Sequence, residues 1–283
     1  MSPWQQVLSE ELQQWPVAAA AAAVLDERGA VVHGSRAAQP WASVTKLLTA
    51  LVVLHAADHG ELSLDEQAGP PGSTLRHLLA HASGLSRETQ RVQAPPATRR
   101  IYSNSGYEVV AAHVEGRLRT PFADLVHDRL LAPLEMHGTR FAGSAAHGAV
   151  GPVQDLARLA GELLEPRLLP ARLVGQATAP AFGRLAGVLP GFGHQDPNDW
   201  GLGPELRGTK TPHWTSPHNA PSTFGHFGQS GSFLWVDPVA RVACVGLSGT
   251  PFGPWAADRW PVLASRVLAV SGDPDREARD RTG

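Results

Sequence analysis

Apolar residues near the N-terminus recur at helical spacing and then give way to short runs. They fall every three or four positions over residues 4–15, which predicts an amphipathic helix that Pro16 ends. The Ala-rich run 17–25 is ambiguous, because alanine is the best helix former. A turn-like stretch at 26–29 and a second apolar run at 30–33 make a β-hairpin the alternative reading.

The middle of the chain carries helical patterns, and the last third reads mostly as strands. Residues 44–59 are apolar on nearly every face, which predicts a buried helix. Shorter helices are predicted near residues 74–80, 104–116, 121–131 and 153–164. Beyond about residue 180, two strands at 231–236 and 241–247 precede a last helix at about 254–270, and the charged tail 271–283 is predicted to be disordered.

Strands at both ends with helices between them predict an α+β fold in which the terminal strands share one antiparallel sheet. A length of 283 residues fits one domain, about 1–270, with two packed lobes. The sheet lobe is predicted to comprise about 1–40 and 180–270, and a mostly helical lobe about 41–179.

Composition and charge narrow the classes of function. A net charge of −2 without any basic stripe argues against nucleic acid as a partner. The apolar run 17–25 is too short to span a bilayer, and the start lacks a basic signal-peptide region, so a cytoplasmic protein without membrane partners is expected. The single cysteine, Cys244, has apolar neighbours and is read as a core residue. His55 and His59 have a spacing that can bind zinc, but no H-E-x-x-H motif accompanies them, so we expect neither a metal nor a cofactor.

One pair of residues stands out at the start of the apolar helix. Ser43 and Lys46 lie three residues apart, so a helix places them on one face. Free N–H groups at a helix start favour negative charge, including an oxyanion formed when the serine attacks. Burial lowers the pKa of a lysine from about 10.4, and a neutral amine can then accept the serine proton. The alternative is an N-cap serine beside a surface lysine.

Two further motifs support the catalytic reading. Tyr102, Ser103 and Asn104 offer a phenol that can relay protons and a carboxamide that can hold an amine. His226, Phe227 and Gly228 precede a predicted strand; glycine there lets a substrate lie against the strand edge. A backbone N–H just after it can serve as an oxyanion donor.

The motifs S-x-x-K, Y-x-N and H-F-G, in this order, resemble those of the penicillin-binding-protein and serine β-lactamase superfamily. The similarity is greatest to the branch of class C β-lactamases, D-Ala-D-Ala carboxypeptidases and esterases, and residues 74–85 (TLRHLLAHASGL) fit it too. The resemblance implies a β-lactamase/transpeptidase-like fold with the active site at the lobe junction.

The resemblance also implies roles for matching residues. Ser43 is the expected acylated nucleophile, while Lys46 and Tyr102 share the proton transfer and either one can be the base. Asn104 is expected to orient Lys46 and a substrate amide. The backbone N–H groups of Ser43 and Gln229 are expected to form the oxyanion hole.

The third motif departs from the K-T-G pattern. His226 is at most partly charged near neutral pH, and Phe227 has no hydroxyl to hold a substrate carboxylate. An ester with a small or hydrophobic acyl group is therefore the predicted substrate, with an amide, a D-amino acid peptide or a β-lactam as alternatives. Trp214 is the predicted aromatic wall of the cleft. The competing hypothesis is a catalytically inactive relative that binds a ligand or partner; the sequence does not indicate an oligomeric state.

Overall fold

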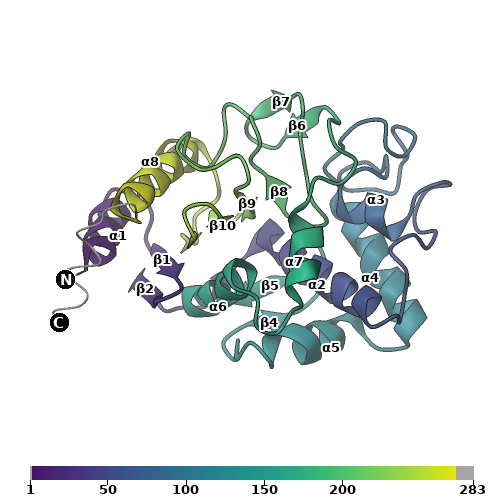
Figure 1. Ribbon diagram of the computed structural model, residues 1–283, viewed down its shortest axis with the longest axis horizontal. Helices are drawn as coiled ribbons and strands as arrows, with labels where there is room; N and C mark the ends of the chain where they lie inside the picture. The colour runs from purple at the N-terminus through teal and green to yellow at the C-terminus, as the bar shows by residue number, and fades with distance from the viewer. Residues whose placement is uncertain (1, 272–283) are drawn as a thin grey trace.

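The computed structural model describes residues 2–271. An antiparallel sheet built from both ends of the chain has helices packed on both of its faces (Figure 1). The strand order is β2-β1-β11-β10-β9-β8. These strands are β1 (Ala21–Asp26), β2 (Gly29–Gly34), β8 (Glu205–Leu206), β9 (Phe224–Gly228), β10 (Ser232–Asp237) and β11 (Val242–Leu247). The sheet confirms the predicted α+β class, and the hairpin of β1 and β2 resolves the ambiguous Ala-rich run.

Alternation along β1 divides the core into two layers. Ala21, Ala23 and Leu25 face the layer that contains α6 (Val153–Leu164). Ala22 and Val24 face the opposite layer, which contains α1 (Pro3–Gln13) and α8 (Pro254–Ser271). These two helices, from opposite ends of the chain, lie side by side over the sheet (Figure 1).

The remaining helices gather around one buried helix on the other side of the molecule (Figure 1). The central helix is α2 (Thr45–Asp58), nearly all of whose residues are buried, as its apolar sequence predicts. Its neighbours include α4 (Asn104–Leu118), α5 (Phe122–Val126), the π-helical turn His127–Leu131 and α7 (Ala171–Thr178). The short helix α3 (Leu75–Leu79) packs against α4.

Several short elements escape prediction from the sequence. They are α7, the strands β8 and β9 of the main sheet, a small sheet of β3 (Gln39–Pro40), β4 (Arg140–Phe141) and β5 (Ala149–Gly151), and the hairpin of β6 (Gly187–Leu189) and β7 (Gly193–Gln195). His226, Phe227 and Gly228, predicted to precede a strand, lie within β9. Ser271 still belongs to α8, so the predicted tail begins one residue too early, and residues 272–283 lie outside the described residues. Within residues 2–271 no helix combines the length and apolar character that crossing a membrane requires. The division into lobes at residues 40 and 180 stays a prediction.

Candidate active site

Ser43 lies on a single helical turn, Ala42–Val44, that leads directly into α2. Ala42 has a φ of 43°, a left-handed conformation that costs an alanine of order 1–3 kcal/mol and needs support from its surroundings. Strand β9 gives that support, because a Cβ on Gly228 would lie 2.6 Å from the Trp41 carbonyl oxygen and 3.0 Å from the Ala42 Cβ. The glycine predicted to admit substrate therefore makes room for the turn that carries the serine.

The Lys46 amine is completely buried and is bonded to three groups. Nζ donates to Asn104 Oδ1 at 2.7 Å and to the Ala146 carbonyl at 3.0 Å, and it lies 3.4 Å from Ser43 Oγ. Burial holds the pKa of Lys46 well below its usual range, and the positive charge of Arg87 lowers this pKa further. The buried site therefore favours the neutral form of the amine beside the serine hydroxyl more strongly than water does.

Tyr102, from a separate segment of the chain, lies beside Ser43 and Lys46. Its ring centroid lies 4.8 Å from Lys46 Nζ, and its phenol lines the same pocket as Ser43. Burial raises the pKa of Tyr102, and a hydrogen-bonding contact with Ser43 only partly opposes this rise. The phenol therefore stays protonated near neutral pH, where it can donate or relay a proton.

Asn104 is the first residue of α4 and uses both ends of its amide. Oδ1 accepts from Lys46, while Nδ2 donates to Glu88 Oε1 at 2.9 Å and to Oε2 at 3.1 Å. Glu88 also pairs with Arg87 at 3.0 Å. Sequence reasoning missed both charged residues, because nothing in a loop sequence shows that a carboxylate there will accept hydrogen bonds from Asn104.

The pocket beside Ser43 is narrow and mostly apolar. Its lining residues are Ser43, Arg87, Tyr102, Leu189, Pro190, Trp200, Glu205, His226, Phe227 and Gln229. Trp214, the predicted wall, is buried outside this lining, and its indole N–H donates to Glu205. That prediction is wrong, because a buried carboxylate satisfies the indole inside the core; Trp200 lines the pocket instead.

His226 is a neutral imidazole in this pocket. Its Nδ1 lies 2.7 Å from the Phe227 carbonyl oxygen, which can only accept, so Nδ1 carries the proton. Nε2 is then an acceptor, and it is buried without a hydrogen-bond partner among the described residues. Burial lowers the pKa of His226 to about 3, and the nearby Lys46 acts in the same direction. The third motif therefore offers an uncharged ring with an unpaired acceptor instead of a cation.

The other third-motif residues divide between the pocket and the core. Phe227 lines the pocket, and its ring also packs against Trp214, Phe252 and Trp260. Gln229 follows the last paired residue of β9 and lines the pocket, so its backbone N–H lies outside the strand ladder.

Within residues 2–271 no cluster of three or more potential metal ligands occurs. The rings of His55 and His59, whose spacing could suit zinc, stack on each other with centroids 4.2 Å apart.

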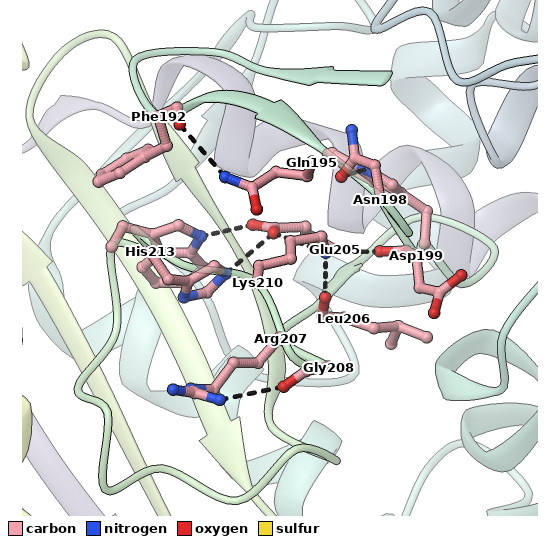
Figure 2. A network of polar contacts seen from close by, with 12 residues as sticks. Phe192, Gln195, Asn198, Asp199, Glu205, Leu206, Arg207, Gly208, Lys210 and His213 are labelled. Carbon is pink, nitrogen blue, oxygen red and sulfur yellow. Dashed lines mark hydrogen bonds and ion pairs between the residues drawn. The ribbon is translucent and has the colours of Figure 1, made fainter. Parts of the chain in front are cut away.

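A buried ionic network surrounds Glu205, which also lines the pocket (Figure 2). Glu205 Oε1 lies 2.9 Å from both Lys210 Nζ and His213 Nε2, and these side chains are almost completely buried. Burial alone would raise the pKa of Glu205, but attraction to Lys210 and His213 outweighs it and holds the pKa well below its usual range. Sequence reasoning left His213 without a role and missed the other two residues.

Replacing Glu205 by glutamine is expected to destabilise the fold by about 3 kcal/mol, because the buried Lys210 charge loses its partner. This corresponds to a drop in Tm on the order of 10 °C, measurable by calorimetry. The control is Glu27→Gln, which removes an exposed pair with Arg241 and is expected to change stability by about 0.5 kcal/mol or less. Because the Glu205 pKa is lowered, the Glu205→Gln deficit should shrink as pH falls below 4.5; equal Tm values for both variants contradict this prediction.

Comparison with solved structures finds the same fold. A β-lactamase from Mycobacterium bovis superposes with a TM-score of 0.91 at 48% identity, covering 93% of this chain and 99% of that one. EstCE1, a hydrolase with promiscuous acyltransferase activity, superposes with a TM-score of 0.77 at 15% identity, covering 94% of this chain and 97% of its own.

A more distant match is the D-alanyl-D-alanine-carboxypeptidase/endopeptidase AmpH of Escherichia coli (strain K12), which is 24% identical over 140 residues. That match spans only 36% of this chain and 36% of the length of AmpH. The Beta-lactamase family model matches a much longer part of the chain, residues 12–268. The matched range includes the turn with Ser43, helix α4 and strand β9. The chain therefore belongs to the Beta-lactamase family and has its serine hydrolase fold.

Proposed function

We propose that this protein hydrolyses esters through a covalent acyl-enzyme on Ser43. The observation that carries the proposal is the buried Lys46 amine, which contacts Ser43 Oγ at 3.4 Å while Asn104 holds it in place. Ser43 Oγ attacks the acyl carbon, its proton passes to Lys46 directly or through Tyr102, and the alcohol leaves with that proton. A water molecule then releases the acid and restores the serine.

The oxyanion of each tetrahedral intermediate is expected to lie between the backbone N–H groups of Ser43 and Gln229. Both residues line the pocket, and both N–H groups are placed by rigid elements, the turn before α2 and the end of β9. An oxyanion donor typically contributes about 2.7–4 kcal/mol to transition-state stabilisation.

The choice of an ester follows from the electrostatics of the third motif. A substrate carboxylate needs a cation or a hydroxyl beside β9, whereas His226 offers a neutral ring with an unpaired acceptor, and Phe227 offers no polar group. A carboxylate placed against the His226 lone pair would lose hydration without gaining a partner. A neutral or hydrophobic acyl group avoids this penalty.

Burst kinetics test the proposal. With p-nitrophenyl butyrate, we expect a stoichiometric release of p-nitrophenol and an acyl adduct that mass spectrometry locates on Ser43. Nitrocefin and a D-Ala-D-Ala peptide should turn over more slowly. Efficient nitrocefin hydrolysis would favour β-lactamase activity, the activity named for the 48% identical Mycobacterium bovis protein. Saturable ligand binding without any adduct would favour the inactive relative.

The pH dependence of acylation reports on the charges around Lys46. Glu88 and Glu108 raise the pKa of this lysine, whereas burial and Arg87 lower it. Glu88→Gln is therefore expected to move the acid limb of the pH profile for kcat/KM to lower pH, and Arg87→Gln to higher pH. Because both groups are partly exposed, shifts of about half a pH unit are expected. If both variants shift the acid limb in the same direction, that limb does not follow the protonation of Lys46.

A further inference from the structure

A second cavity opens beside the pocket that contains Ser43 and shares three of its lining residues, Arg87, Tyr102 and Pro190. Its volume is about 420 Å³, far larger than the narrow space at the nucleophile. The other residues of its lining are Gln93, Arg99, Arg100, Ile101, Ala186, Gly187, Val188 and His194. We call this cavity the cationic groove.

A backbone bridge between residue 100 and β6 forms the floor of the cationic groove. The backbone of Arg100 forms an isolated parallel β-bridge with Gly187 of β6, and its N–H donates to the Ala186 carbonyl at 2.8 Å. Gly187 permits this approach, because a Cβ there would lie 2.2 Å from the Arg100 carbonyl oxygen. Val188 adds an apolar surface that is 60% exposed. An apolar segment of a substrate can therefore lie on this floor as it leaves the nucleophile pocket.

Charge in the cationic groove has one sign. Arg87, Arg99 and Arg100 contribute to its lining, and the lining contains no aspartate or glutamate. Arg100 is buried and donates only to backbone carbonyls, those of Ala80, Ala181, Phe182 and Asn198. Burial lowers its pKa to about 10, so it remains charged at neutral pH and contributes positive potential from below.

Arg99 is the group best placed to make a direct contact. It is exposed, and one of its guanidinium N–H groups donates to the Gln93 carbonyl at 3.2 Å, which steadies the side chain. No carboxylate pairs with it among the described residues, and the remaining donors of its planar fork match a carboxylate or phosphate. Arg87, by contrast, already pairs with Glu88.

We propose that the cationic groove binds a negatively charged end of the ester substrate, which an apolar segment links to the bond that Ser43 attacks. This inference rests on the proposed function and extends it. It places recognition of an anion at Arg99, on the far side of Tyr102, instead of at the neutral third motif. The charge belongs either to the acyl half or to the alcohol half of the substrate.

Matched ester pairs test the inference. On the acyl side, the p-nitrophenyl monoester of adipate is compared with the same compound capped as a methyl ester. On the alcohol side, the butyrate ester of 4-hydroxybenzoate is compared with that of 4-hydroxybenzamide. The expected result is a preference in kcat/KM for the anionic member of one pair, which identifies the half that carries the charge. Salt should weaken the preference, because it screens exposed charges.

Variants connect the preference to the cationic groove. Arg99→Gln is expected to reduce the ratio of anionic to neutral kcat/KM by about tenfold, the contribution of one charged hydrogen bond. Arg140→Gln, which removes an exposed arginine on β4 outside the lining, is the control and should leave the ratio unchanged. Equal use of both members of each pair, or a preference that survives Arg99→Gln, overturns the inference while leaving ester hydrolysis intact.

A binding measurement keeps the test independent of catalysis. Calorimetry with Ser43→Ala protein and adipate monomethyl ester should detect binding that weakens with salt and with the added Arg99→Gln change. If no ester is hydrolysed but this binding is present, the proposed function fails and the anion site stands. Absence of binding in the Ser43→Ala protein overturns the anion site.

Discussion

Replacement of Ser43 by alanine is expected to reduce kcat/KM for p-nitrophenyl butyrate by at least about 10⁴-fold, the scale seen when a serine hydrolase loses its nucleophile. Alanine leaves the turn Ala42–Val44 and the buried Lys46 in place but removes the atom that forms the acyl bond. The initial burst should disappear, and a fluorophosphonate probe should no longer label the protein. Stopped-flow absorbance and intact-protein mass spectrometry measure both effects.

The control for this change is Ser63→Ala, an exposed serine beyond the C-terminal end of α2. It is expected to keep the wild-type burst and the wild-type Tm. If Ser43→Ala turns over the ester at the wild-type rate, Ser43 is not the acylated nucleophile and the proposed mechanism is wrong.

Lys46→Met is expected to lower kcat/KM by about 10³–10⁴-fold while the fold is retained, because methionine fills the buried site without offering a base. The same change gives a signature in stability. Burial lowers the pKa of Lys46 below the 10.5 of an exposed lysine, so the unfolded chain binds more protons over the window between the two pKa values. The wild-type protein therefore gains stability as pH rises through that window, and the variant lacks this gain.

Thermal unfolding of both proteins between pH 6 and about pH 10 measures the difference, since a lysine titrates across this range when its pKa is lowered. Lys210→Met is the matched control, because Lys210 is buried too but forms an ion pair with Glu205. That variant should lose stability outright and should still be labelled at Ser43 at temperatures where it is folded. Parallel stability curves for wild type and Lys46→Met would mean that Lys46 is not the titrating amine.

Hydrophobic spacing and helix caps predict the helices whose formation depends mainly on residues close together in the sequence. The buried α2 follows from a run of apolar residues on every face, and α1 follows from its spacing and its Ser2 cap. The Ala-rich strand β1 could not be assigned with certainty, because its intrinsic helix preference is overridden by pairing with β11, more than two hundred residues away along the chain. Two- and three-residue strands such as β3 and β6 have too few side chains to produce a period.

Like the fold, the candidate site contains some residues that the sequence predicts and others that only the folded structure identifies. Ser43, Lys46, Tyr102 and Asn104 could be found because helix spacing and motif order identify them, and the structure brings them together. Glu88 and Glu205 could not, since their importance arises from partners that tertiary folding supplies. Trp214 was misassigned for a related reason: whether an indole faces a cleft or a buried carboxylate depends on contacts that composition does not show.

Lys46 and Lys210 are the only lysines in the sequence, and both are buried. Activated esters commonly acylate surface lysines of a hydrolase, and such background labelling obscures a catalytic adduct. Here neither lysine amine is exposed to solvent, so an activated ester is not expected to label surface lysines and this source of background is removed. The same property means that amine-directed dyes and resins cannot attach through the lysines of the folded protein, and immobilisation needs another handle.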